Sequence, residues 1–302
     1  MMSLSPIETR VPCDGLEYPV LQAGADGPLV LCLHGFPDNY EGYRGIATEL
    51  AAAGYQVVCP LLPGYAPANQ RRDGGVHDAL YVRDALIKLI ETLLAERGQT
   101  RCFLVGHDWG SVIACLIAQK RPDLFVSLCA MSVPYGMSWR KIALRCPVYM
   151  LHAWYILFFQ FKGLADAIIR RKGFRFLAWM LKFWSPKLES LAQMQRSVIA
   201  TFSQPGVLAA ALDYYRTSMF ALTPKAFHIR ALFNKTIEVP TLALRGELDV
   251  TMPSAVWEVV SPQAYPKGIT LEVYQGAGHF IQYEQGPAIA QRLLQWFSQH
   301  PA

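Results

Sequence analysis

The sequence predicts an α/β protein in which a mostly parallel central sheet is flanked by helices and carries an inserted helical block. Short apolar runs alternate with helix-length amphipathic segments up to about residue 134 and again after residue 239. One of these runs, residues 29–33, is apolar throughout, as in strands covered on both faces. Between the two limits the alternation stops, and only aromatic-rich patterns of helix length remain.

Eight short runs rich in β-branched and aromatic residues are predicted to form the sheet. The predicted strands are 7–11, 16–21, 29–33, 55–59, 101–105, 126–131, 241–245 and 269–274. The first two flank the turn Cys13-Asp14-Gly15, which favours a hairpin at the edge of the sheet. Steady spacing of helices between the later strands is typical of βαβ units and therefore of parallel strands.

Apolar residues at three- and four-residue spacing predict the helices. The predicted helices of the α/β part are 45–53, 79–97, one that begins beyond Gly110, one after Pro253, and 285–298. Those of the inserted block are 142–161, 164–184, 188–202 and 205–222. We therefore expect a core domain formed by residues 1–134 and 240–302, and a helical cap formed by residues 135–239.

Composition restricts the class of protein. The chain has 302 residues, of which 52% are apolar and 17% charged, and this suits a compact globular enzyme or binding protein. Its seven cysteines are an odd number and include no Cys-x-x-Cys pair. We expect free thiols, a reducing cytoplasmic location, and neither zinc nor another metal or cofactor. The first residues do not resemble a signal peptide.

Positive charge is concentrated in one part of the chain. The net charge is +5, but residues 139–187 contain ten Lys and Arg against a single acid. The apolar run 146–161 has 16 residues, shorter than the roughly 20 of a spanning helix. This basic, aromatic segment is compatible with peripheral contact to a membrane. A homodimer is also compatible with the sequence, and we expect no nucleic-acid partner.

The segment Gly106-His107-Asp108-Trp109-Gly110 joins a predicted strand to a predicted helix. Two glycines around a central side chain allow the sharp turn called a nucleophile elbow, which raises that side chain above the sheet. Here the central side chain is a carboxylate. The alternative is that Asp108 only caps the helix, which is a common role for aspartate after a strand.

Four polar elements follow four predicted strands. They are His34 in His-Gly-Phe-Pro, Asp108, Asp249, and His279 in Gly-Ala-Gly-His-Phe. Each one alone is ordinarily a loop or capping residue. Ligands of open α/β sheets bind beyond the carboxyl ends of the strands, so these four should converge on one crevice. Their order along the chain is nucleophile, acid and histidine, with Asp249 preferred to Glu247 as the acid.

With these motifs in place, the sequence resembles an α/β-hydrolase-fold enzyme of the epoxide hydrolase and haloalkane dehalogenase branch. The resemblance extends from about residue 29 to the C-terminus. It implies that Asp108 attacks the substrate and forms a covalent ester, and that His279 activates the water that cleaves it. Asp249 would orient His279. Backbone N–H groups of Phe36 and Trp109 would form an oxyanion hole.

The resemblance also implies tyrosine hydroxyls in the cap that protonate the departing epoxide oxygen. The matching segments point to Tyr155 and Tyr215, with Tyr214 as the competitor of the latter. Tyrosines on aromatic helices otherwise serve mainly in packing. His34 and Pro37, from the motif around Phe36, are expected beside the substrate.

The leading prediction is an epoxide hydrolase that converts an apolar or lipid-like epoxide, with water, to a vicinal diol, as in detoxification. A haloalkane dehalogenase is the alternative, since it shares the aspartate and Trp109. Such enzymes often hold the halide with an asparagine where this chain has Phe36, which weakens that alternative. A catalytically silent binding protein of the same fold is a third hypothesis.

Overall fold

The computed structural model describes residues 5–136, 142, 149–218, 223–233 and 235–301. Its centre is one eight-stranded sheet in the order β1-β2-β4-β3-β5-β6-β7-β8. The strands are β1 (Ile7–Cys13), β2 (Leu16–Ala23), β3 (Leu29–Leu33), β4 (Gln56–Pro60), β5 (Cys102–His107), β6 (Phe125–Met131), β7 (Thr241–Gly246) and β8 (Ile269–Tyr274). All eight predicted strands are confirmed.

The sheet is mostly parallel, as predicted. β1 and β2 form an antiparallel hairpin at one edge, and β2 pairs antiparallel with β4. Every pair from β4 to β8 is parallel. The carboxyl ends of β3, β5, β6, β7 and β8 therefore meet at one edge of the sheet, where the loops that follow them lie close together.

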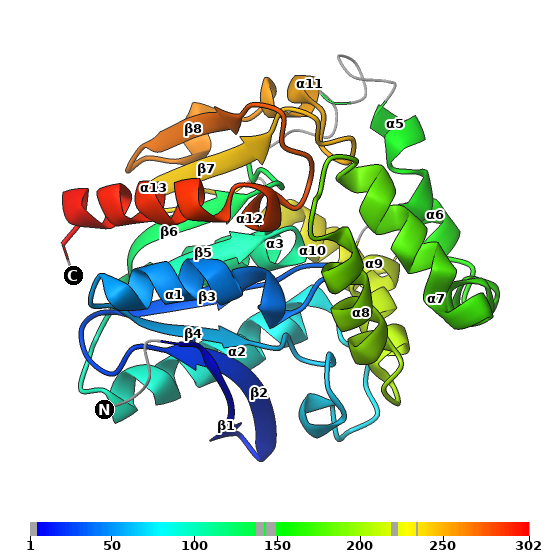
Figure 1. Cartoon of the computed structure of the whole chain (residues 1–302), viewed down its shortest axis with the longest axis horizontal. Coiled ribbons are helices and arrows are strands. Elements are labelled where there is room, and N and C mark those ends of the chain that lie inside the picture. Colours follow the sequence, from blue (N-terminus) through cyan, green and yellow to red (C-terminus); the bar gives the residue numbers. More distant parts are fainter. Residues whose placement is uncertain (1–4, 137–141, 143–148, 219–222, 234, 302) are drawn as a thin grey trace.

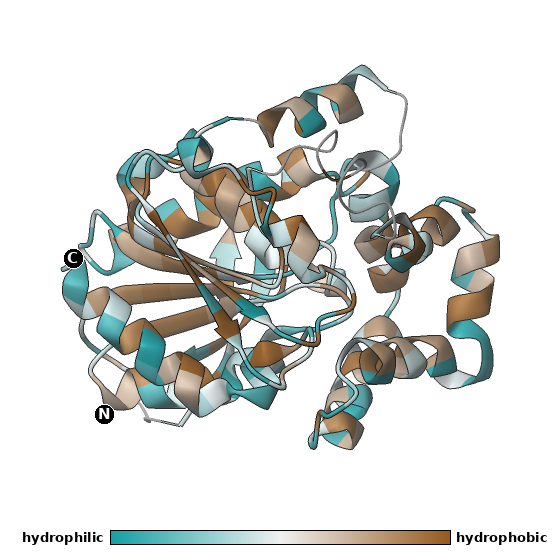
Figure 2. Ribbon diagram, turned by 90° about the horizontal axis from the view of Figure 1, so that it is seen from above, coloured by the Kyte–Doolittle hydropathy of each residue, from teal (hydrophilic) through white to brown (hydrophobic). Residues whose placement is uncertain are grey.

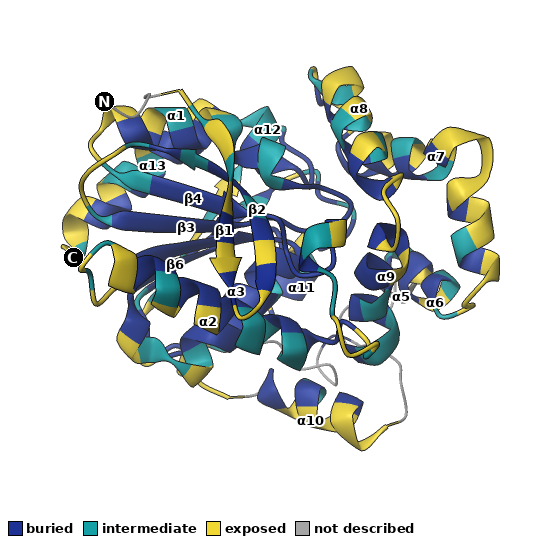
Figure 3. Ribbon diagram, turned by 90° about the horizontal axis from the view of Figure 1, so that it is seen from below, coloured by how far each residue is buried: buried dark blue, intermediate teal, exposed yellow. Residues whose placement is uncertain are grey.

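The sheet is covered on both faces (Figure 1). Helices α1 (Arg44–Ala52) and α13 (Gly286–Gln299) cover one face, and α2 (Ala79–Glu96) and α3 (Trp109–Lys120) cover the other. In β3, Leu29, Leu31 and Leu33 pack in the core on the α2 and α3 side, while Val30 and Cys32 pack on the α1 and α13 side. The central strands are accordingly hydrophobic (Figure 2) and buried (Figure 3).

Between β6 and β7 the described residues form only helices. They are α5 (Tyr149–His152), α6 (Trp154–Phe159), α7 (Leu164–Trp184), α8 (Leu191–Phe202), α9 (Val207–Ser218) and α10 (Pro224–Leu232). After β7, two short helices follow, α11 (Ser254–Trp257) and α12 (Ile281–Glu284). The division into a core domain and a cap with the boundaries given above stays a prediction.

The helix predicted over 142–161 is wrong as a continuous helix. Where this range is described, α5 ends at His152 and α6 begins at Trp154. The two helices are separated at Ala153, where φ is −86° and ψ is 10°. Next to this break, His152 Nδ1 lies 2.7 Å from the carbonyl oxygen of Val250 in the loop after β7, a tertiary contact that periodicity in the sequence cannot reveal.

The helix predicted over 164–184 is present but broken. Residues 171–174 of α7 have non-helical backbone angles, and Lys172, Gly173 and Phe174 all have positive φ. The chain therefore turns a corner inside α7. α10 was not predicted, although its signal is in the sequence. Pro224 occupies its first turn, and the Thr223 side chain accepts a hydrogen bond from the Ala226 N–H at 3.2 Å.

Candidate active site

Asp108 lies at the junction of β5 and α3 with φ 52° and ψ −120°, a left-handed conformation that is unusual for aspartate. The two glycines of the motif make this turn sterically accessible. A Cβ atom on Gly110 would lie 2.0 Å from the Leu33 carbonyl oxygen, and one on Gly106 would lie 2.4 Å from the Gly110 carbonyl oxygen. The close approach of α3 to the end of β3 therefore requires Gly110, and that of β5 to the first turn of α3 requires Gly106.

Gly110→Ala is expected to lower the free energy of unfolding by about 3 kcal/mol or more, because backbone atoms cannot move away from the new methyl group. Gly45→Ala is the matched control, since Gly45 is an exposed helical residue with no atom within 4 Å of the added carbon. It should raise the free energy of unfolding by roughly 0.4–1 kcal/mol. Urea denaturation measures both variants, and equal losses would contradict the steric argument.

The Asp108 carboxylate is buried and its two oxygens have different neighbours. The backbone N–H of Phe36 donates to Oδ1 at 2.7 Å. Oδ2 lies 3.6 Å from Nε2 of His279, which has no hydrogen-bond partner among the described residues. One carboxylate oxygen is thus held by the loop after β3, and the other faces a histidine that is free to bind a third group.

Asp249 and Thr251 fix the imidazole of His279 from its other side. His279 Nδ1 lies 2.9 Å from Asp249 Oδ2 and 2.9 Å from the Thr251 hydroxyl. Thr251 in turn donates to Asp249 Oδ1 through its hydroxyl, at 2.7 Å, and through its N–H, at 2.8 Å. These contacts put the proton of Nδ1 toward Asp249. Sequence reasoning missed Thr251, although a threonine two residues after an aspartate is a common turn pattern.

The backbone of His279 is also held. Its carbonyl oxygen accepts a hydrogen bond from the Ser132 hydroxyl at 2.7 Å and lies 2.9 Å from Nε2 of His107. Its N–H donates to the carbonyl oxygen of Trp184, at the end of α7, at 2.9 Å. The histidine loop is therefore tied both to β5 and β6 and to the helical block.

The charges around His279 favour its protonated form. Burial disfavours the imidazolium, but Asp249 and Asp108 outweigh burial and raise the pKa of His279 to about 10. Burial likewise opposes the charge of Asp249, yet the nearby His279 holds the pKa of that carboxyl below its usual value. The two buried groups stabilise each other as an ion pair.

This pairing predicts a pH dependence of stability. The pKa of His279 is about 10 in the folded chain and 6.5 as its ordinary value, so its stabilising contribution is complete below pH 6.5 and is lost as the pH rises toward 10. The melting temperature of the wild type minus that of His279→Gln should therefore fall by roughly 5 °C or more over this range. A constant difference would contradict the raised pKa.

Tyr155 of α6 and Tyr215 of α9 lie opposite Asp108, with their ring centroids 6.1 Å apart. The Tyr215 hydroxyl is buried and has no partner among the described residues. Burial raises the pKa of each hydroxyl well above its ordinary value, and the Asp108 charge adds to the effect. The Tyr214 hydroxyl points elsewhere, donating to the carbonyl oxygen of Pro63 at 2.7 Å.

Aromatic rings surround these groups. Phe36 makes edge contacts with Tyr215, Phe159 and Phe202 at centroid distances of 5.3, 5.4 and 5.5 Å. Trp109 packs against Tyr215 at 5.1 Å. Tyr215 and the Phe36 loop that binds Asp108 are thus surrounded mainly by apolar ring surface.

His34 and Pro37 support the loop after β3. Both residues are buried, and His34 Nδ1 lies 3.0 Å from the carbonyl oxygen of Gly35, while its Nε2 accepts the N–H of Leu62 at 3.0 Å. Burial is the main cause that lowers the pKa of His34, to about 4. Both ring nitrogens are therefore occupied by the backbone. The geometry gives His34 a role in holding the loop that carries Phe36, and contact of His34 and Pro37 with substrate stays a prediction.

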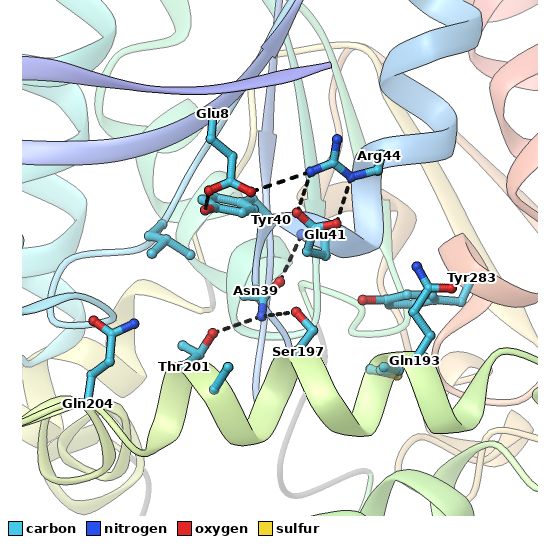
Figure 4. Close-up of a pocket in the computed structure, with 13 residues that line it drawn as sticks. Glu8, Asn39, Tyr40, Glu41, Arg44, Gln193, Ser197, Thr201, Gln204 and Tyr283 are labelled. Carbon is cyan, nitrogen blue, oxygen red and sulfur yellow. Dashed lines mark hydrogen bonds and ion pairs between the residues drawn. The ribbon is translucent and has the colours of Figure 1, made fainter. Parts of the chain in front are cut away.

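A groove of about 410 Å³ lies beside this site, between α8 and the loop after β3 (Figure 4). Asn39 donates to the Ser197 hydroxyl at 2.8 Å and to the Thr201 hydroxyl at 2.9 Å, which joins the two elements. None of the residues lining this groove is Asp108, Asp249, His279 or either tyrosine above. In the described ranges, no group of three His, Cys, Asp or Glu side chains is arranged to hold a metal ion.

The sequence of this chain is similar to those of known α/β-hydrolase-fold proteins. The family model for the alpha/beta hydrolase fold matches residues 28–285. Human "Epoxide hydrolase 4" is 30% identical over 295 residues, which cover 95% of this chain and 77% of that protein. "Epoxide hydrolase A" of Mycobacterium tuberculosis is 28% identical over 327 residues, covering 97% of this chain and 98% of that protein.

Solved structures show the same fold. The crystal structure of an epoxide hydrolase from Vigna radiata superposes with a TM-score of 0.79 at 22% identity, covering 98% of each chain. Epoxide Hydrolase A from Mycobacterium thermoresistibile has a TM-score of 0.77 at 24% identity, covering 97% of this chain and 98% of the other. The agreement over nearly the whole length extends to the helices between β6 and β7.

Proposed function

Since this chain belongs to the α/β-hydrolase fold family, and within it to the epoxide hydrolases, we propose that it opens epoxides to vicinal diols through an ester on Asp108. The observation that carries the proposal is a carboxylate at the elbow with His279 Nε2 3.6 Å from its Oδ2. The test is to measure diol formation from a styrene-type epoxide alongside halide release from a haloalkane. Diol without halide supports the proposal, and halide alone overturns it.

The nature of the electrophile explains the carboxylate. An epoxide offers a saturated carbon, and attack by a serine hydroxyl there would leave an ether that water cleaves poorly. Attack by Asp108 leaves an ester, which a water activated by a histidine hydrolyses readily. The chain has no Gly-x-Ser-x-Gly elbow, which also argues against an ordinary esterase.

In the first step Oδ2 of Asp108 forms a bond to one epoxide carbon, and the bond from that carbon to the ring oxygen breaks. Oδ2 is the attacking atom because Oδ1 is already held by the Phe36 N–H. The departing oxygen takes a proton from Tyr155 or Tyr215, whose hydroxyls bind it together. The product is a hydroxyalkyl ester and a tyrosinate.

In the second step His279 takes a proton from water, and the resulting hydroxide attacks Cγ of Asp108. The negative charge develops on Oδ1, where the N–H groups of Phe36 and Trp109 stabilise it. His279 then returns its proton to the departing alkoxide, which completes the diol. The proton left on Asp108 goes to the tyrosinate, so the enzyme returns to its starting state.

The ester also changes the charges that act on the neighbouring groups. Asp108 contributes to the raised pKa of His279 and to those of Tyr155 and Tyr215. Once Asp108 is a neutral ester, its own contribution to these pKa values is lost. This loss favours the tyrosinate formed in the first step and the neutral imidazole required in the second.

Tyr155→Phe and Tyr215→Phe are each expected to lower kcat for an epoxide by about 10- to 100-fold, and the double variant by more, because the leaving oxygen loses its proton donors. Tyr214→Phe is the matched control. Its hydroxyl binds Pro63, so kcat should stay within about twofold while stability falls by roughly 1 kcal/mol. A larger loss of kcat in Tyr214→Phe than in Tyr215→Phe would reverse this assignment.

The finer properties of the enzyme belong to the same proposal. The aromatic lining around Phe36 favours an apolar or lipid-like epoxide. We propose a cytoplasmic location and leave room for a homodimer, which sedimentation at several protein concentrations would detect. We also propose peripheral contact with a membrane surface. The exposed residues of the outer helices α6 and α7 support this contact.

A further inference from the structure

Five aromatic rings form a continuous cluster on the outer surface of α6 and α7. Trp154 lies 6.1 Å from Phe158 and from Trp179, and Phe158 and Phe176 are 5.3 Å apart. Trp179 stacks on Phe183 with centroids 5.2 Å apart and planes 7° from parallel. We call these five residues the aromatic face.

Three rings of the aromatic face are exposed, although large rings are normally buried, and Phe158 and Phe176 are half-buried beneath them. Trp154, Trp179 and Phe183 are 39%, 47% and 45% accessible. Leu157 and Phe161, which extend the patch along α6 and beyond it, are 56% and 55% accessible. A contiguous apolar surface of this kind is typical of an interaction site.

α7 contains three of the five rings and also carries five cations. Arg170, Arg171, Lys172, Arg175 and Lys182 are all exposed, and none has an acidic side chain within ion-pair distance in the described part of the chain. The only acid of α7, Asp166, is paired with Arg216 of α9.

Helix geometry places two of these charges beside a ring. Arg175 is four residues before Trp179 and Lys182 three residues after it, so both flank that ring on the same side of the helix. Arg171 and Lys172 stand at the corner where α7 changes direction, and Arg170 comes just before it. The charge of Arg175 and Lys182 is therefore uncompensated and lies next to the exposed Trp179, and the other three cations add to the positive charge of the same helix.

The aromatic face points away from the sheet. α9 packs against both α6 and α2 and so lies between the outer helices and the α/β core, and α7 forms the outer edge of the block (Figures 1 and 3). The described helices include none that is both long enough and apolar enough to span a bilayer. A surface contact is the mode that remains for this face.

We propose that the aromatic face and its five cations bind the surface of an anionic lipid bilayer. Tryptophan and phenylalanine insert at the level of the headgroups, and Lys and Arg attract the acidic headgroups around them. Charge complementarity selects this occupant, because a neutral apolar partner would leave five cations unmatched. The proposal goes beyond the reaction and does not depend on it, although an apolar epoxide dissolved in the bilayer would thereby come close to the enzyme.

The test is flotation of the full chain with vesicles of phosphatidylcholine containing increasing phosphatidylserine, at low and at physiological salt. Two variants alter the face, the triple variant Lys172→Glu, Arg175→Glu, Lys182→Glu and the double variant Trp179→Ser, Phe183→Ser. The control for the first is Arg72→Glu, Lys235→Glu, Lys267→Glu, which reverses three exposed cations elsewhere. The control for the second is Leu271→Ser, which replaces an exposed apolar side chain of β8.

Binding should rise with the phosphatidylserine fraction and fall with salt. The triple variant should bind at least roughly 100-fold more weakly, since each basic residue near such a surface contributes about fivefold. The double variant should also lose binding, and both controls should bind as the wild type does. Turnover of a water-soluble epoxide, measured without lipid, should be unchanged in all four, which separates this proposal from the assignment of Asp108.

Three outcomes would overturn the proposal. They are absence of binding to acidic vesicles at low salt, equal binding by the variants and their controls, and binding to neutral vesicles that salt does not affect. Sedimentation of the wild type and the double variant gives a fourth. Self-association that Trp179→Ser, Phe183→Ser abolishes would assign the face to a second copy of the chain.

Discussion

Asp108→Ala is expected to lower kcat for epoxide hydrolysis by about 10⁴-fold or more, because the atom that forms the ester is gone. In the proposed mechanism the remaining groups can still bind the epoxide oxygen and orient water, but no carboxylate is left at the elbow to attack the epoxide carbon. Steady-state diol production, measured with enzyme in high concentration, gives the value. KM should change much less than kcat.

The control for this substitution is Asp123→Ala, which removes an exposed carboxylate paired with Arg121. It should leave kcat within about twofold, since surface ion pairs contribute little. Circular dichroism should be the same for Asp108→Ala and the wild type, because the side chain accepts only the Phe36 N–H among the described residues. If a folded Asp108→Ala variant kept a tenth of the wild-type activity, Asp108 could not be the nucleophile.

His279→Gln is expected to separate the two steps. Ring opening needs Asp108 and the tyrosines, so the first turnover should still consume about one equivalent of epoxide per enzyme. Hydrolysis of the ester needs the imidazole, so steady-state turnover should fall by about 10³-fold or more. Rapid quench followed by steady-state measurement distinguishes the burst from the slow phase.

The matched control is His228→Gln, which replaces an exposed histidine of α10 and should behave as the wild type. A His279→Gln variant with neither burst nor turnover would place the histidine in ring opening as well. A variant with normal steady-state turnover would exclude His279 as the base. In both cases the assignment of roles within the site would have to change, while the family would not.

The sheet could be predicted closely from sequence because its signals are local. A fully apolar run such as Leu29–Leu33 has little alternative to a doubly covered strand. The helices between β6 and β7 are harder to predict. The break between α5 and α6 is a change of backbone angles at Ala153, and the corner in α7 consists of positive φ at Lys172 to Phe174, and periodicity reports neither.

The site was predicted in outline from the positions of polar residues at strand ends. Asp108, Asp249 and His279 come together as expected, since parallel strands share one carboxyl edge. Thr251 could not be predicted, because its role depends on its distance to His279 Nδ1. The positioning role of His34 could not be predicted either, because it depends on contacts of both ring nitrogens with backbone groups. Contacts of this kind follow from the folded geometry and have no sequence signature of their own.

The most direct measurement is mass spectrometry of His279→Gln after brief incubation with an epoxide such as styrene oxide. The enzyme should gain the mass of one epoxide, and peptide mapping should place the gain on Asp108. Substitution of Asp108 in the same background should abolish the adduct. No adduct with epoxides, an adduct with haloalkanes only, or a gain on a residue other than Asp108 would contradict the ester that this account requires.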